Sequence, residues 1–497
     1  MQWWTFSVVI AVGCLTACSR DSSSKGGDGD TNTGPTGDST SSDSGGSSDE
    51  GDSGTVSGDT DSAKDTRGDS ASETETSGED PETAEVPGSI SPDAIYYVRE
   101  GASGDGSSWT DALPNLPAVL SRGDLYYIAD GTYGGYTFDD PESGEAYIHI
   151  RKATPADHGT DDGWEDAFGD GRALWNELVF ASSFYLFDGA RGGGPGAWDT
   201  DFGFEVVASW TEAERNGRMV RLESDVHHIR IRHADFHPEV THRGFGVAFH
   251  GSDGQYAVHI DHCWAHDIFG VFLLTRSCSR FLLEYNYFLN NLNTSEWHSE
   301  FSSDVGSDDM VFRFNRFEEI QGTAVFAGVN GNADNPHERW AIYGNVFRNN
   351  RTHIVRYYWT ENDDENEAVD WVFYNNTIMG DGTGSGNVLW DQYRNVSVTN
   401  NLWYNYRAPD YLGFPVEITQ YNGFHQCDFL YAVSENMDTE TNTVSDTEPF
   451  LSPVDDRFEL AGPTEPGASL PEPYQHDMYG HRRGEDGNWD RGAVEWE

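Results

Sequence analysis

Carboxylates gather near the middle of the chain, in the run EWHSE at 296–300 and in Asp304 shortly after it. Carboxylate oxygens in a loop are the ligands that a hard cation such as calcium needs. Glu296, Glu300 and Asp304 are therefore candidate calcium ligands. The alternative is a solvated acidic turn, because nothing here matches the spacing of an EF-hand loop. A second acidic run at 361–367 leaves the same alternatives open, and there a protruding acidic loop is the favoured interpretation.

A second set of polar and aromatic residues would line one long face if their segments stack in register: His250, Glu300, His353, Arg356, Tyr357, Trp359, Trp390, Asp391 and Tyr393. A β-elimination needs a base, a proton donor and a group that neutralises a carboxylate. His353 or Tyr357 could be the base or the acid, and Arg356 the neutralising group. A glycoside hydrolase needs two carboxylates across a cleft, for which Glu300 and Asp391 are the candidates. Trp359, Trp390 and Tyr393 could stack on sugar rings. The alternative is that these side chains only decorate the surface, since a slip of one residue in register turns a side chain to the other face.

Histidines form a looser group at His227, His228, His233, His237 and His242, with His259, His262 and His266 further on. Zinc needs ligands that converge in space. Alternation along a strand sends neighbours such as His227 and His228 to opposite faces, so most of the group cannot share an ion. We therefore expect these histidines to be surface and corner residues. The chain also carries no nucleophile elbow, phosphate loop or dinucleotide fingerprint.

The elements that would position these residues follow from a repeat. Alternating apolar residues, then Asn or His, one residue and a large apolar residue recur in VHIDHCW at 258–264 and VFRFNRF at 311–317, among other segments. The period of two indicates strands and argues against short helical repeats. The polar position is occupied by His262, Asn286, Asn315, Asn345, Asn376 and Asn401. A spacing of 24 to 31 residues between these positions equals one coil of a solenoid with two or three short strands.

Stacked coils place equivalent residues above one another, so the recurrent Asn side chains should bond to neighbouring coils at a corner, where Asn also tolerates left-handed backbone. The apolar residues two positions later should form a ladder inside the solenoid: Phe288, Phe317, Phe347, Ile378 and Trp403. A second apolar strand follows each first one, and its copies at 246–250, 270–275, 322–329, 352–359 and 387–393 should form the next wall.

The folded part, residues 92–497, resembles right-handed parallel β-helix proteins, a group that includes pectate-lyase-like surface proteins and polysaccharide lyases. Three regions carry the resemblance: 95–116 followed by 123–133, then 147–154, and finally 446–460 with 477–497. The resemblance implies an all-β solenoid with an N-terminal cap at about 92–135, in which a strand, a short helix and a second strand cover the first coil. It also implies a C-terminal module at about 446–497.

The resemblance extends to alginate lyases and chondroitinase B, in which an acidic segment at a comparable coil binds calcium and a catalytic Lys and Arg follow. Here residues 302–331 contain no Lys, and AVFAGVNG at 324–331 contains no Arg. That departure leaves two functions open. One is an enzyme that engages a polysaccharide and cleaves it as a lyase or a hydrolase. The other is a non-catalytic surface adhesion module or a structural protein of the cell envelope.

The first 91 residues predict export and anchoring. Residues 1–18 are apolar and uncharged, and Leu15-Thr16-Ala17-Cys18 resembles the lipobox of bacterial lipoproteins, which implies acylation of Cys18. The alternative is an ordinary signal peptide cleaved after Ala17, since the usual basic residue before the apolar run is missing. Residues 19–91 are a Ser/Gly/Asp-rich segment that cannot bury enough apolar surface to fold, and we expect a disordered tether. We expect a protein at the outer membrane or cell surface that contacts the membrane through its lipid only.

The net charge of the chain limits the classes of partner that it can bind. The chain carries a net charge of −55; the tether holds 18 acidic and 4 basic residues, which leaves −41 for residues 92–497. Nucleic acid is excluded as a partner because phosphates attract Lys and Arg. Cell-surface glycans and divalent cations remain compatible with this charge, and we expect a monomer. Three cysteines lie in the folded part, Cys263, Cys278 and Cys427, and the first two could form a disulfide or remain buried thiols.

Overall fold

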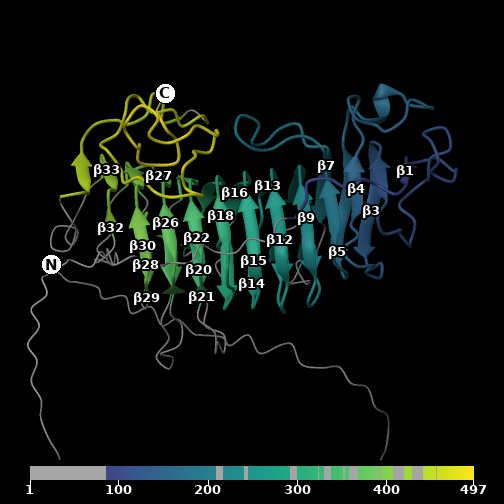
Figure 1. The fold of residues 1–497 in the computed structure, drawn as a ribbon, viewed down its shortest axis with the longest axis horizontal. Helices are drawn as coiled ribbons and strands as arrows, with labels where there is room; N and C mark the ends of the chain where they lie inside the picture. The colour runs from purple at the N-terminus through teal and green to yellow at the C-terminus, as the bar shows by residue number, and fades with distance from the viewer. Residues whose placement is uncertain are drawn as a thin grey trace, which may run out of the picture. The chain divides into compact units, whose positions relative to one another are not determined.

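The structure is a computed structural model that describes residues 86–208, 217–239, 245–291, 299–322, 324–328, 337–350, 353–357, 368–383, 386–390, 393–406, 419–427, 440–454 and 456–496. The predicted leader at 1–18, with Cys18, and nearly all of the predicted tether at 19–91 lie outside these residues. The regular secondary structure of the described part consists of short parallel strands (Figure 1) and one 3-10 helix, η1, at Asp166–Phe168. No helix within the described residues is long and apolar enough to cross a bilayer.

The first column of strands contains one short strand from each coil, and every hydrogen-bonded pair in it is parallel. In spatial order it consists of β1 (Ile95–Val98), β2 (Leu125–Ile128), β4 (Ile148–Lys152), β6 (Tyr185–Asp188), β9 (His227–Arg232), β12 (Tyr256–Asp261), β15 (Ser279–Glu284), β18 (Val311–Arg313), β22 (Ala341–Tyr343), β26 (Val372–Tyr374), β30 (Ser397–Thr399) and β32 (Thr419–Gln420). Strands that are neighbours in this column lie one coil apart in the sequence.

A second and a third column share one sheet because the two halves of β5 pair with different strands, β7 and β8. The second column contains β3 (Gly131–Phe138), β5 (Ala173–Phe180), β7 (Phe204–Ala208), β10 (Ala234–Pro238), β13 (Trp264–His266), β16 (Tyr287–Asn291), β19 (Arg316–Ile320), β23 (Val346–Arg348), β27 (Thr377–Met379), β31 (Leu402–Tyr404), β33 (Gly423–His425) and β34 (Thr443–Ser445). The third contains β8 (Gly217–Leu222), β11 (Gly246–Gly251), β14 (Gly270–Arg276), β17 (Ser302–Val305), β20 (Ala324–Gly328), β24 (His353–Tyr357) and β28 (Val388–Trp390). A small separate sheet joins β21 (His337–Glu338), β25 (Ala368–Val369) and β29 (Tyr393–Arg394).

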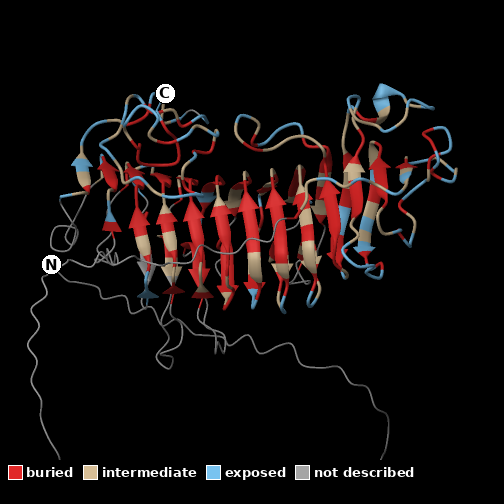
Figure 2. Cartoon of the chain, in the orientation of Figure 1, coloured by how far each residue is buried: buried red, intermediate tan, exposed pale blue. Residues whose placement is uncertain are grey.

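This arrangement is a right-handed parallel β-helix, as the repeat predicts. The core runs inside the columns, where inward side chains of all three form one buried cluster. Figure 2 shows that most of the strand residues are buried. One coil could not bury its own apolar side, so stacking of the coils creates the core.

The predicted Asn ladder is present and fully buried. Asn345 shows the pattern: its Oδ1 accepts from the backbone N of Asn315 at 2.9 Å, and its Nδ2 donates to the carbonyl O of Phe312 at 2.8 Å and to Oδ1 of Asn376 at 3.1 Å. The same bonds continue past Asn401 to Asn422 and Asn442, two members that the sequence interpretation missed. The ladder therefore ties consecutive coils together by both side chain and backbone.

Two details of the predicted corner are wrong. The first ladder position is Cys263, not His262, because the backbone N of Cys263 donates to Oδ1 of Asn286 at 2.9 Å, while His262 pairs with Asp261. The left-handed backbone also belongs to the residue before each ladder position and not to the ladder Asn. These residues have φ between 52° and 64°: His262, Tyr285, Phe314, Gly344, Asn375, Asn400 and Tyr421.

The predicted apolar ladder is confirmed. Phe288, Phe317, Phe347, Ile378 and Trp403 pair in register along the second column, and each is buried. Ring centroids of Phe317 and Phe347 lie 5.0 Å apart in stacked geometry. Such stacking favours one residue type at successive coils because identical rings pack well against each other.

The two ends of the coil stack carry extra segments. Residues 99–124, between β1 and β2, form turns and contain no helix, so the short helix expected in the N-terminal cap is wrong. The C-terminal segment from Phe450 onward packs on the outside of the last coils, with Phe450, Phe458 and Tyr474 in a second apolar cluster. Ala493 N donates to Thr377 Oγ1 at 2.8 Å. Cys263 and Cys278 are free buried thiols, so the disulfide alternative is not realised.

Candidate functional site

The third column turns two rows of side chains away from the central cluster because its strands bend, and some of these side chains, such as Val247, Ala324 and Ala327, are still buried. Consecutive residues such as Met219 and Val220 in β8, or Ile354 and Val355 in β24, both belong to the buried core. A regular strand would turn every second side chain inward, so two successive inward residues mark a bend. The residues just before and just after each inward pair therefore lie outside the core on this column.

Register along the column puts several charged and imidazole groups in these rows. One row runs through Arg221, His250, Leu274, Ser303, Ala327 and Arg356. The other row contains Arg218 beside Val247 at one end and Ala324 beside His353 further along. The sequence prediction that His250, His353 and Arg356 share a wall is thus correct. Arg218 and Arg221 were missed, although their strand, GRMVRL at 217–222, carries the apolar pattern of its neighbours.

Both histidines are in their neutral form near neutral pH. Burial lowers the pKa of His250 to about 4, and the charges of Arg218 and Arg221 add to the effect. Burial and the charge of Arg356 lower the pKa of His353 to about 4 in the same way. The Nδ1 atom of each ring is buried and has no hydrogen-bond partner among the described residues. A neutral imidazole beside a guanidinium can accept a proton while the guanidinium holds an anion.

The predicted calcium ligands are placed differently from one another. Asp304 is fully buried, where Oδ1 accepts from Thr275 Oγ1 at 2.6 Å and Oδ2 lies 2.8 Å from Nδ1 of His337. The carboxylate oxygens of Asp304 therefore contact groups inside the protein and connect three coils. Glu300 is also buried, two residues before the start of β17. Glu296 lies outside the described residues, and calcium at this triplet stays a prediction.

Some predicted residues cannot be placed as side chains. The backbones of Tyr357 and Trp390 pair in register on β24 and β28, as expected. Their side chains, the residues Trp359 and Asp391, and the acidic run 361–367 lie outside the described part. The placement predicted for Tyr393 is wrong. Tyr393 lies on β29 in the small separate sheet and is 37% exposed, so it does not belong to the third column. The reason is that the predicted strand 387–393 divides into two strands, β28 and β29, that join different sheets.

Comparison with known proteins adds fold-level neighbours. No protein-family model matches the sequence, and no curated protein matches it. Among solved structures, the chain is similar to the pectate lyase Pel9A, with a TM-score of 0.40, 15% identity and coverage of 82% of this chain and 98% of that one. It is similar to a rhamnogalacturonan lyase, with a TM-score of 0.40, 12% identity and coverage of 72% and 91%. It is also similar to the alginate lyase AlyGC, with a TM-score of 0.39 and 13% identity over 66% of this chain, which spans half of that lyase.

The chain is a parallel β-helix. Its own strand order carries that assignment, because similarity at these TM-scores is too low to carry any residue role. The β-helix fold hosts many activities, so function has to be argued from the site.

Proposed function

We propose that the outer face of the third column binds an extended acidic polysaccharide. The observation that carries the proposal is the concentration of Arg218, Arg221 and Arg356, with two histidines, on one column of a chain whose net charge is −55. Strands in a sheet lie about 4.8 Å apart, so Arg221 and Arg356, five strands apart, are separated by about 24 Å along the stack. A linear chain of uronate sugars lying along the stack would meet both guanidinium groups.

The row between these two ends contains His250, Leu274, Ser303 and Ala327, of which Ser303 and Ala327 are buried. The described part of this column thus carries a guanidinium group at each end of the row and an imidazole beside the first.

The finer proposal is cleavage by β-elimination. Arg356 would neutralise the uronate carboxylate, which acidifies the neighbouring C–H, and neutral His353 would remove that proton. The glycosidic C–O bond would then break with formation of a C=C bond, and Tyr357 is the candidate that protonates the departing oxygen. Calcium at Glu296 and Glu300 would assist by holding the same carboxylate. The alternative is a non-catalytic adhesion module that uses the same face for binding only.

The cellular setting is part of the proposal. Acylation of Cys18 would anchor the chain, and residues 19–91 would hold the β-helix away from an outer membrane or cell surface. Metabolic labelling with a clickable fatty acid tests this directly. Wild type should incorporate the label and Cys18→Ser should not; equal labelling of the two would refute the anchor.

The test of binding uses the full chain in detergent and a panel of polysaccharides, with calcium or with a calcium chelator. Alginate, polygalacturonate and chondroitin sulfate should bind, and neutral xylan should not. The double variant Arg221→Ala/Arg356→Ala should weaken binding by roughly 100-fold or more, since each charge-assisted hydrogen bond contributes about 1.5–3 kcal/mol. Arg457→Ala is the matched control, because Arg457 is 62% exposed and pairs with Glu459 in the C-terminal segment.

Turnover is read from the ultraviolet absorbance of unsaturated products and from reducing ends. Unsaturated ends that disappear in His353→Gln support elimination, and reducing ends without unsaturation indicate a hydrolase that uses Glu300 and Asp391. Binding with neither product supports the adhesion alternative. The proposal fails if no acidic polysaccharide binds, or if the double variant binds as well as the Arg457 control.

A further inference from the structure

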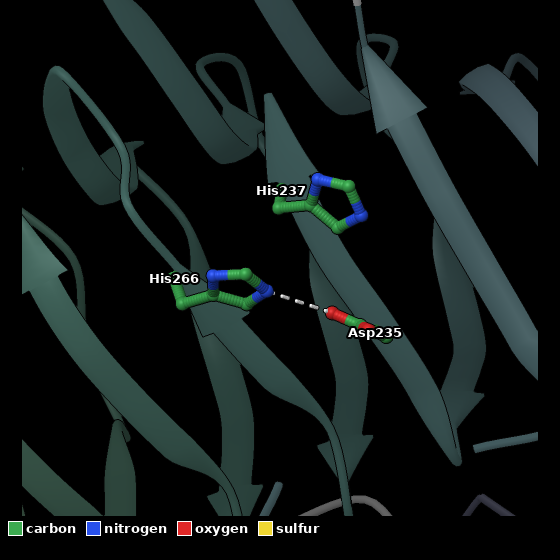
Figure 3. Close-up of side chains that lie close together, drawn as sticks. All are labelled: Asp235, His237 and His266. Atoms are coloured by element: carbon green, nitrogen blue, oxygen red, sulfur yellow. Dashed lines mark hydrogen bonds and ion pairs between the residues drawn. The ribbon is translucent and has the colours of Figure 1, made fainter. Parts of the chain in front are cut away.

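A second cluster lies on the outer face of the second column. Asp235 and His237 project from β10, and His266 projects from the neighbouring β13 (Figure 3). Nε2 of His266 lies 3.1 Å from Oδ1 of Asp235. One ligand atom from each of the three residues lies within 4.8 Å of the other two. The three side chains therefore converge on one point.

Stacking of coils brings these residues together. The register pairs Phe236 with Ala265, which places His237 directly beside His266 one coil away. Asp235 stands two residues before His237 and so points to the same face. The imidazole rings of His237 and His266 are stacked with centroids 5.1 Å apart. Trp264 also stacks on His266, with ring centroids 3.7 Å apart.

Each imidazole is oriented by a hydrogen-bond acceptor that lies next to its Nδ1 atom. Nδ1 of His266 lies 2.8 Å from a carboxylate oxygen of Asp267, whose other oxygen accepts from Asn290. Nδ1 of His237 lies 3.1 Å from the carbonyl oxygen of Pro238. A carbonyl and an ionised carboxylate only accept hydrogen bonds, so each Nδ1 carries the proton and each Nε2 faces the cluster. Metal-binding histidines show this same arrangement, in which the distal N–H donates to a carboxylate or a carbonyl.

The charge of the surroundings favours a cation. Besides Asp235 and Asp267, Glu205 on β7 places Oε1 3.1 Å from Nε2 of His237. Arg172 opposes these carboxylates by pairing with Asp235 Oδ2 at 2.8 Å and Glu205 Oε2 at 3.3 Å. Arg172 thus takes the oxygen of Asp235 that does not face His266, and leaves Oδ1 toward the cluster.

We propose that Asp235, His237 and His266 bind a divalent transition-metal ion, for which zinc is the best match. Two imidazole nitrogens and one carboxylate oxygen are ligands that zinc, cobalt and nickel accept, whereas calcium and magnesium prefer oxygen alone. Three protein ligands leave one position of a tetrahedral ion for water or for Glu205. The site lies on the second column, so it is independent of the glycan face proposed on the third.

The test is titration of the full chain with zinc and with cobalt, in excess calcium to occupy sites made of carboxylates alone. One ion per chain should bind, and cobalt should give the intense visible absorption of a tetrahedral nitrogen–oxygen site. Saturating zinc should also raise the unfolding temperature, because a ligand that binds only the folded state stabilises it.

Variants separate this site from other histidines. His237→Ala and His266→Ala should abolish one-to-one binding, and Asp267→Asn should weaken it by roughly 10- to 100-fold because it only orients a ligand. His158→Ala is the control and should bind as wild type does, since His158 pairs with Asp161 far from the cluster. Far-ultraviolet circular dichroism checks that each variant is folded, and Asp267→Asn gives a graded effect should an alanine variant fail to fold.

The proposal is overturned by any of three results: no saturable binding of zinc or cobalt, full binding in the His237→Ala/His266→Ala double variant, or loss of binding only in a His227→Ala/His228→Ala double variant. The last result would move the site to that pair, whose Nδ1 atoms lie 2.8 Å apart.

Discussion

Replacement of Asn345 by Ala should strongly destabilise the β-helix. Asn345 lies near the middle of the Asn ladder and is fully buried. Its side chain makes four hydrogen bonds: two accepted from the backbone N and Nδ2 of Asn315, and two donated to Phe312 O and Asn376 Oδ1. All four are lost in Asn345→Ala.

The expected magnitude follows from these four bonds. A hydrogen bond in a folded protein contributes about 1 kcal/mol net, so the loss is about 4 kcal/mol. Asn315 N also loses its side-chain acceptor, whereas Asn315 Nδ2 still donates to Leu283 O and Asn376 Oδ1 still accepts from Asn345 N. One buried unsatisfied group costs about 1–3 kcal/mol, which moves the expected loss to about 5–7 kcal/mol. That is a large part of the stability of an ordinary domain, about 5–15 kcal/mol.

The assay is urea unfolding of wild type and variant, followed by circular dichroism. Asn176→Ala is the matched control, because Asn176 is an exposed Asn within strand β5. Since a solenoid can unfold in parts, hydrogen exchange across residues 311–379 should accompany the melt and show faster exchange in the coils around position 345. A loss below about 1 kcal/mol, or one equal to that of the control, would refute the reasoning that the ladder holds the coils together.

Three further predictions rest on single residues. Burial raises the pKa of Glu495 to about 7 from an ordinary value near 4.5, so the folded state retains a proton that the unfolded state releases. The stability of the C-terminal segment should therefore fall by about 3 kcal/mol as the pH rises from about 4.5 to 7. In urea melts, Glu495→Gln should make the stability less dependent on pH over this range. Burial raises the pKa of the Cys263 and Cys278 thiols, so a thiol reagent should label Cys427 first. Cys263 and Cys278 should react only when the protein unfolds. Fast labelling of Cys263 or Cys278 in the native protein would contradict their burial. Phe317→Ala should lower the free energy of unfolding by about 3–5 kcal/mol in the same melts. A change near zero would mean that the aromatic stack does not stabilise the core.

The fold was predictable from the sequence because a ladder repeats a residue type at a fixed spacing. The ladder position was misjudged only where the motif changes residue type, at His262 and Cys263. Asn422 was missed although Asn422-Gly423-Phe424 fits the motif, since its coil is shorter, with 21 residues after Asn401. Coil length varies with the loops, whereas the corner chemistry does not, so the motif is a better guide than the spacing.

The candidate sites were predictable only in part, because contacts between coils depend on register. His353 and Arg356 were placed correctly, since they lie three residues apart on one strand. The argument that dismissed the histidines concerned neighbours in one strand. It failed for His227 and His228, whose Nδ1 atoms lie 2.8 Å apart, and it did not apply between strands, where His237 and His266 meet. They are 29 residues apart, which is one coil, and each stands three residues after its ladder-equivalent position, Ala234 and Cys263. Measuring every polar residue from the nearest ladder position would have paired them.

The two proposed sites and the ladder have one physical cause. Each coil adds one residue to every row, and the ladder hydrogen bonds fix the height of that residue relative to its neighbours. On the third column, the part of the outer row from Leu274 to Arg356 is therefore positioned by buried amides that never touch a ligand, whereas Arg221 and His237 lie on coils that precede the first ladder position, Cys263. Because those amides leave coils little freedom to slide, this part of the row is held in place before any ligand arrives, and binding does not have to supply the free energy of ordering it.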